Sequence, residues 1–179
     1  MRAVCVFCGS RPGARPAYRD LAVELGRELA ARSLALVYGG ASVGLMGAMA
    51  DAALSAGGRV IGVIPRTLVD RELAHAGLSE LHVVDTLHQR KALMAERADA
   101  FVALPGGVGT LDELFEIVTW RVLGLHAKPI GILDPGDYFE SLAALLDHMV
   151  GEGFLEPGHR MLIAGAARPS DLLDQFAHG

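Results

Sequence analysis

Short apolar runs alternate along the chain with segments in which apolar residues recur at helical spacing. Such runs, bounded by glycine, proline or polar residues, predict β-strands, and the segments between them predict helices. The runs are continuous rather than alternating, as expected of strands that are covered on both faces. We therefore predict parallel strands at Arg2–Cys8, Leu34–Tyr38, Arg59–Ile64, Leu81–Val84, Ala100–Leu104 and Pro129–Leu133.

Helical periodicity fills the spaces between these strands. It is clearest at Leu21, Leu25 and Leu29, and again from Leu111 through Phe115 and Val118 to Val122. Two more helices are predicted around Tyr138–Val150 and Ser170–Ala177. Strands that alternate with helices indicate βαβ units. With no repeat, linker or low-complexity segment in view, we expect one α/β domain over residues 1–179, a doubly wound parallel sheet flanked by helices.

The charge balance narrows the class of ligand. The 179 residues carry a formal net charge of −5 and contain no basic run. A nucleic-acid surface needs clustered Lys and Arg, so nucleic-acid binding is disfavoured, whereas a small phosphorylated metabolite needs one local positive site. The N-terminal apolar run is too short for a signal peptide, and no stretch reaches the roughly 20 apolar residues of a membrane span. We expect a cytoplasmic protein without a membrane partner.

Cys5 and Cys8 are the only cysteines, and their C-x-x-C spacing suggests redox or metal chemistry. They lie within the first predicted strand, where positions three apart point to opposite faces. That placement is unsuited to a disulfide or a shared metal, and a zinc site would need further ligands. We interpret both as buried structural thiols and expect no metal and no cofactor.

Ligands of doubly wound folds bind outside the carboxyl ends of the strands, in loops that lead into helices. Three such ends carry suggestive loops: Gly9-Ser10, the segment from Gly39 to Gly44, and Pro105–Thr110. All three can converge on one rim. Additional ligand contacts are therefore predicted from Gly9, Ser10, Gly40, Ser42 and Met46.

The loop Gly106-Gly107-Val108-Gly109-Thr110 follows a predicted strand and opens an amphipathic helix. Glycines let the backbone approach a ligand closely, and helix N-terminal N–H groups favour an anion. The alternative is a tight turn with nothing bound. The loop lacks the Gly-Lys-Ser/Thr ending of a P-loop, and no segment fits G-x-G-x-x-G well. A NAD-dependent oxidoreductase is thus a minor alternative.

Glu113 has two interpretations. Thr110-Leu111-Asp112-Glu113 fits a capping box, in which the glutamate folds back onto the start of the helix. Alternatively, the carboxylate at the mouth of the glycine loop faces the sugar of a nucleotide. Arg90, in His88-Gln89-Arg90-Lys91, is predicted on the same rim, and its guanidinium suits a phosphate.

Together these segments resemble the LONELY GUY (LOG) family, often mislabelled as lysine decarboxylases, over nearly the whole chain. The opening Val6-Phe7-Cys8-Gly9-Ser10 with Tyr18, the run from Val37 to Gly47, Gly62–Pro65 and Arg71-Glu72-Leu73 all match. The most specific match is the Arg90-Lys91 pair followed by Pro105-Gly106-Gly107-Val108-Gly109-Thr110-Leu111-Asp112-Glu113. Ala41, Arg11, Val108 and Asp112 depart from the usual pattern.

The resemblance implies a Rossmann-like homodimer that cleaves the N-glycosidic bond of cytokinin riboside 5′-monophosphates, and of AMP, to free base and ribose 5-phosphate. It implies that Arg90 and Glu113 are catalytic, and that the partner subunit partly completes the site. Nucleotide contacts are implied for Glu72, Arg90, Lys91, Gly106, Gly107, Val108, Gly109, Thr110, Leu111, Asp112 and Thr119.

Such cleavage develops positive charge on the sugar and negative charge on the leaving base. Glu113 is hypothesised to stabilise the sugar cation and orient water, and Arg90 to stabilise the base or phosphate. A pyridoxal-dependent decarboxylase does not fit a chain of this size, whose only lysines are Lys91 and Lys128. A non-catalytic nucleotide or molybdenum-cofactor carrier of the same fold is the remaining alternative, which would not need both Arg90 and Glu113.

Overall fold

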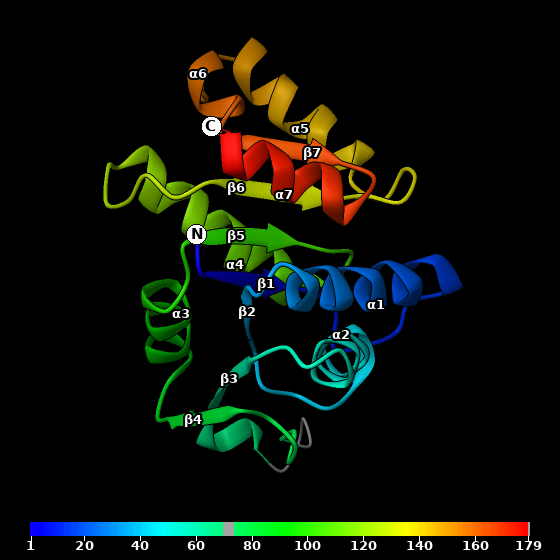
Figure 1. The fold of residues 1–179 in the computed structure, drawn as a ribbon. Coiled ribbons are helices and arrows are strands. Elements are labelled where there is room, and N and C mark those ends of the chain that lie inside the picture. The colour runs from blue at the N-terminus through cyan, green and yellow to red at the C-terminus, as the bar shows by residue number, and fades with distance from the viewer. Residues whose placement is uncertain (70–73, 179) are drawn as a thin grey trace.

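The computed structural model describes residues 1–69 and 74–178. Within these ranges one sheet of parallel strands runs through the molecule in the order β4-β3-β2-β1-β5-β6-β7. The strands twist progressively from one edge of the sheet to the other (Figure 1). Their bounds are β1 Ala3–Phe7, β2 Ala35–Tyr38, β3 Val60–Pro65, β4 Glu80–Val84, β5 Ala100–Ala103, β6 Ile130–Leu133 and β7 Ile163–Ala166.

Helices cover both faces of this sheet, and each face has its own apolar core. On one face lie α1 (Pro16–Ala31), α2 (Gly44–Ser55) and α7 (Pro169–His178). On the other lie α3 (Leu87–Glu96), α4 (Val108–Val122) and α5 (Glu140–Gly151). Figure 1 shows α1 and α7 in front of the central strands and α4 behind them. The short helices η1 (Arg66–Leu68) and α6 (Pro157–Arg160) complete the described elements. The predicted doubly wound α/β fold is confirmed.

The six predicted strands are present, with ends within two residues of those expected, but two expectations were incomplete. The strand β7 was not predicted, because its sequence Ile-Ala-Gly-Ala is short and carries little apolar bulk. In β4, Leu81 and Val83 are 40% and 42% exposed, so the expectation that every strand is covered on both faces is wrong there. The reason is that β4 lies at the edge of the sheet, where the flanking helices cover less of the strand than they do at the centre.

Cys5 and Cys8 are free thiols in opposite cores, as their spacing predicts. Burial raises the pKa of both well above the usual range of a thiol, so both stay protonated. No group of three potential metal-ligating side chains occurs among the described residues. Nor does that part of the chain contain a helix with the length and apolarity to cross a membrane.

The close packing of α1 on α2 depends on Gly26. A Cβ atom there would lie 2.4 Å from the carbonyl oxygen of Met49 and 3.1 Å from the amide nitrogen of Ala53, both backbone atoms of α2. We expect Gly26→Ala to lower the free energy of unfolding by about 1–3 kcal/mol, because the two helices must separate. Urea denaturation measures this, with Gly151→Ala as control, since a Cβ there meets nothing within 4 Å. Equal stability of the two variants would contradict this account of the packing.

Candidate active site

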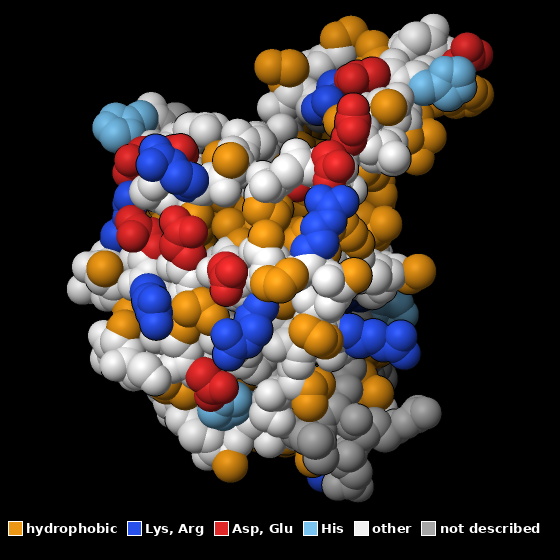
Figure 2. Space-filling view, turned by 90° about the vertical axis from the view of Figure 1, so that its right-hand side faces the viewer, with side chains coloured by type: hydrophobic (Ala, Val, Ile, Leu, Met, Phe, Trp, Pro, Cys, Tyr) orange, Lys and Arg blue, Asp and Glu red, His pale blue; other side chains and the backbone are white. Residues whose placement is uncertain are grey.

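The strands β2, β1 and β5 are neighbours in the centre of the sheet, and the loops that follow them meet at the carboxyl ends of these strands. The Gly9 amide donates to the Pro105 carbonyl at 3.1 Å, and the Leu45 amide donates to the Gly9 carbonyl at 3.1 Å. These bonds tie all three loops to one another, so the predicted convergence is confirmed. Figure 2 shows this side of the molecule, with apolar atoms in its middle and acidic and basic side chains around them.

A cavity of about 450 Å³ lies between these loops. One wall is the glycine loop, residues 106–109, with the first turns of α4. The other walls come from the ends of β1 and β2, from α1, α2 and α3, and from the residues before α5. The lining side chains and backbone belong to Val6, Cys8, Gly9, Ser10, Arg11, Gly13, Tyr18, Gly39, Leu45, Met46, Arg90, Pro105, Gly106, Gly107, Val108, Gly109, Thr110, Glu113 and Tyr138.

The start of α4 provides backbone donors to this cavity. Gly107 is the N-cap residue, with extended backbone and no side-chain capping bond, and the first helical bond runs from the Leu111 amide to the Gly107 carbonyl at 3.2 Å. The amides of residues 108–110 therefore have no acceptor within the helix. A Cβ at Gly106 would lie 2.1 Å from Oγ1 of the buried Thr110, so only glycine fits there. Amides without an acceptor in the helix, together with the helix dipole, suit this helix start to an anionic ligand.

The capping-box interpretation of Thr110 and Glu113 is wrong. Because α4 begins at Val108, Thr110 is already inside the first turn and Glu113 lies in the second. A capping box does occur at α3, where Thr86 Oγ1 accepts from the Gln89 amide at 3.1 Å and Gln89 Oε1 accepts from the Thr86 amide at 3.2 Å. That box fixes the first turn of α3, which carries Arg90.

Arg90 reaches from α3 to the floor of the cavity and is only 7% exposed. Its Nη2 donates to the carbonyl oxygen of Gly39 at 3.2 Å, whereas its Nε has no hydrogen-bond partner among the described residues. A Cβ at Gly39 would lie 1.9 Å from Nη2, so glycine at the end of β2 makes room for the guanidinium. A buried cation with spare donor capacity beside a cavity is suited to an anionic ligand.

Glu113 lines the same cavity from α4. The charges of both Glu113 and Arg90 act on Cys8 in the same lining, and the pKa of Cys8 is raised mainly by burial. The charge of Glu113 raises that pKa further, and the charge of Arg90 lowers it. An acidic and a basic residue thus line the cavity from α4 and α3, together with the glycine loop.

Lys91 does not line this cavity. Its Nζ lies 3.1 Å from Asp112 Oδ2 and 3.0 Å from Glu116 Oε2. Burial lowers the pKa of Lys91, but hydrogen bonds to Glu116 and Asp112 outweigh this and leave it raised. These ion pairs join α3 to α4 next to Arg90 and Glu113 in the sequence. They are suited to fixing the position of the two helices relative to each other.

The remaining predicted contacts divide into two groups. Gly9, Ser10 and Met46 line the cavity, as does each residue from Gly106 to Thr110. Gly40, Ser42, Leu111, Asp112 and Thr119 do not line it. Thr119 is exposed, with its hydroxyl donating to the Phe115 carbonyl at 2.7 Å. Glu72 lies outside the described residues.

The sequence reasoning missed Arg11, Tyr18 and Tyr138 as cavity residues. Tyr138 follows β6, a fourth strand whose carboxyl end lies at this rim, so the same rule that selected the other loops could have included it. Its loop has no phosphate-type glycine pattern, so the local sequence gives little sign of a ligand contact there.

Fold and site together define a Rossmann-like α/β protein whose cavity is lined by a glycine loop, a buried arginine and a glutamate. Residues 46–176 match the family described as "Possible lysine decarboxylase". The probable cytokinin riboside 5′-monophosphate phosphoribohydrolase LOGL9 of Oryza sativa subsp. japonica is 54% identical over 175 residues, 98% of this chain and 77% of that protein. The cytokinin riboside 5′-monophosphate phosphoribohydrolase LOG7 of Arabidopsis thaliana is 48% identical over 98% of this chain and 81% of its own length. The chain belongs to this LONELY GUY family.

Among solved structures, the molybdenum cofactor binding protein of Rippkaea orientalis superposes with a TM-score of 0.75, covering 99% of this chain and 96% of that one. Its sequence is only 21% identical, so the likeness establishes the shared fold and nothing about the ligand.

Proposed function

We propose that this protein hydrolyses the N-glycosidic bond of cytokinin riboside 5′-monophosphates, and of AMP, to the free base and ribose 5-phosphate. The observation that carries the proposal is the placement of Arg90 and Glu113 on one cavity with the unpaired amides of α4. Relatives at 48–54% identity are named as phosphoribohydrolases.

The first step is the binding of the 5′-phosphate. The amides of residues 108–110 and the positive end of the α4 dipole attract the phosphate dianion. Binding energy from this remote group then holds the ribose in place, with its anomeric carbon near Glu113. A nucleoside without the phosphate lacks this anchor and is expected to be a poor substrate.

The second step is the cleavage of the bond between the ribose and the base. Positive charge develops on the sugar, and the carboxylate of Glu113 stabilises it and orients the water that attacks the anomeric carbon. The electrons of the broken bond leave with the base, and Arg90 stabilises that negative charge or the charge of the phosphate. Water supplies the hydroxyl of ribose 5-phosphate and the proton that the base takes up.

Two alternatives have weaker support. A cofactor carrier rests on structures of 21% identity, which share the fold, whereas the named hydrolases share about half of all residues. A Schiff-base decarboxylase would need a lysine at the cavity. Lys91 is held by Asp112 and Glu116, and the Nζ of Lys128 donates to the Ala95 carbonyl at 2.8 Å.

A substrate panel tests the proposal. The purified protein is incubated with isopentenyladenosine 5′-monophosphate, AMP and GMP, and with adenosine as the control that lacks phosphate. We expect free base from the adenine nucleotides and at most a trace from adenosine. Equal rates with AMP and adenosine would contradict the anchoring role of the glycine loop, and tight binding without turnover would favour a carrier.

We also propose a homodimer in which the partner contributes to each site. Leu123 and Leu125, just after α4, are 67% and 69% exposed, whereas Trp120 and Val122 pack partly on the core. Thr119, on the same stretch, faces solvent instead of its own cavity. Light scattering is expected to give about twice the 18.9 kDa chain mass. The Leu123→Glu variant should have a lower mass than the unaltered protein. If both have the mass of a monomer, the homodimer proposal is wrong.

A further inference from the structure

The β6–α5 loop, residues 134–139, is held in one shape by a single carboxylate. Oδ1 of Asp134 accepts from the amides of Gly136 at 3.0 Å and Tyr138 at 3.1 Å, and Oδ2 accepts from the Phe139 amide at 2.8 Å. The Asp134 amide in turn donates to the Ala166 carbonyl of β7 at 3.0 Å. Phe139 is buried, at 3% exposure, so the end of the loop is anchored in the core.

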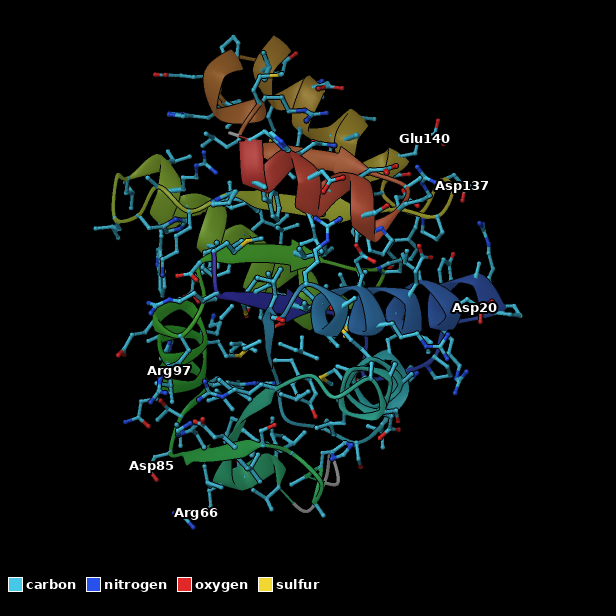
Figure 3. All side chains as sticks on the ribbon, in the orientation of Figure 1. Asp20, Arg66, Asp85, Arg97, Asp137 and Glu140 are labelled. Carbon is cyan, nitrogen blue, oxygen red and sulfur yellow. The ribbon has the colours of Figure 1, made fainter. Side chains whose placement is uncertain are left out.

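The same loop is fastened to the start of α1. The carboxylate of Asp137 lies 2.7 Å from the guanidinium of Arg15, and this ion pair holds the pKa of Asp137 below its usual range. The Tyr138 and Tyr18 rings meet edge to face, with centroids 5.6 Å apart. Figure 3 shows Asp137 and, on α1, Asp20 projecting on the same side of the molecule.

From this anchored position Tyr138 reaches the glycine loop, where its hydroxyl donates to the carbonyl oxygen of Gly106. In a trans peptide the carbonyl and the following amide point in opposite directions. The bond therefore sets the direction of the Gly107 amide as well, away from the Tyr138 hydroxyl. Gly106 is packed against Thr110, but a Cβ at Gly107 would meet nothing within 4 Å, so packing constrains the Gly107 side of this peptide little.

We propose that Tyr138 is a positioning residue for phosphate recognition: its hydroxyl, held by the β6–α5 loop, fixes the Gly106–Gly107 peptide so that the amides at the start of α4 are prearranged for the 5′-phosphate. This inference rests on the proposed function for the identity of the ligand. Without the hydroxyl, the glycine turn samples other peptide orientations, and part of the phosphate-binding energy is spent on ordering it. Adenine carries no phosphate, so we expect its binding to be independent of that peptide.

The test compares Tyr138→Phe with the unaltered protein, using ribose 5-phosphate and adenine as separate calorimetric probes. We expect the Kd for ribose 5-phosphate to rise about fivefold, the loss typical of one hydrogen bond, with no change for adenine. The KM for AMP should rise in parallel, with a smaller change in kcat. Asp137→Asn, which loosens the loop but keeps the hydroxyl, is expected to give a smaller shift in the same direction.

Tyr38→Phe is the matched control, because the Tyr38 hydroxyl also donates to a backbone carbonyl, that of Ala41 at 3.1 Å, outside the cavity lining. It should lower the melting temperature without a phosphate-specific loss of affinity. Unchanged ribose 5-phosphate affinity in Tyr138→Phe, or an equal loss for adenine, would overturn the inference. The proposed function is tested separately, by release of free base from AMP by the unaltered protein. Binding of ribose 5-phosphate needs no turnover, so the two tests can fail independently.

Discussion

Replacing Glu113 with glutamine is expected to lower kcat for AMP about a hundredfold or more, with little change in KM. The substitution keeps the size and hydrogen-bonding shape of the side chain but removes the charge. A neutral amide cannot stabilise the developing sugar cation or accept a proton from the attacking water, and such roles contribute about 10²–10⁴ in rate. We expect ground-state binding to persist, because in the proposed mechanism the phosphate is bound by the amides at the start of α4 and not by Glu113.

Glu116→Gln is the matched control for this variant. Glu116 lies one helical turn after Glu113, does not line the cavity, and has its Oε2 3.0 Å from the Nζ of Lys91. We expect it to lose some stability, because the link between α3 and α4 weakens, while keeping most of kcat. Steady-state kinetics with AMP distinguish the two variants. Full activity in Glu113→Gln would refute the assignment of Glu113.

The second large effect is expected at Arg90. Arg90→Met keeps most of the side-chain volume but removes the charge and the donors, and should lower kcat/KM for AMP by two orders of magnitude or more. Thermal stability should change little. One guanidinium nitrogen has no hydrogen-bond partner among the described residues, so the folded chain gains little from a buried cation at this position.

Arg97→Met at the end of α3 is the comparison, because Arg97 is partly exposed and lies 3.9 Å from Glu80, away from the cavity. It should leave kcat/KM near that of the unaltered protein. Melting curves and kinetics on both variants separate function from folding. If Arg90→Met lost activity only in proportion to a lowered melting temperature, Arg90 would be a structural residue.

The parts of the site that were predictable from sequence are those that depend on local pattern. Apolar runs placed the strands, the carboxyl-end rule selected the loops at Gly9, Gly39 and Gly106, and their meeting point follows from the adjacency of β2, β1 and β5. A buried arginine on α3 and a glutamate on α4 lie where those loops converge. The geometry of parallel sheets sets these positions, whereas the catalytic roles predicted for Arg90 and Glu113 came from the family resemblance.

Other features depend on contacts that local patterns do not encode. The Thr110–Glu113 spacing matches a capping box, but Gly107 can cap α4 without a side chain, so the helix starts earlier. Lys91 adjoins Arg90 in sequence, yet the helical turn directs it to Asp112 and Glu116. Tyr138 meets Gly106 across a separation of 32 residues, which only the folded arrangement of β6 and α4 brings about.

The most direct test of the central claim is the balance of products from isopentenyladenosine 5′-monophosphate. Chromatography of a completed reaction should show isopentenyladenine and ribose 5-phosphate in equal amounts, with no inorganic phosphate. Release of isopentenyladenosine and inorganic phosphate would identify a phosphatase, and recovery of the intact nucleotide would indicate a binding protein. Either of these results would contradict N-glycosidic hydrolysis at the cavity of Arg90 and Glu113.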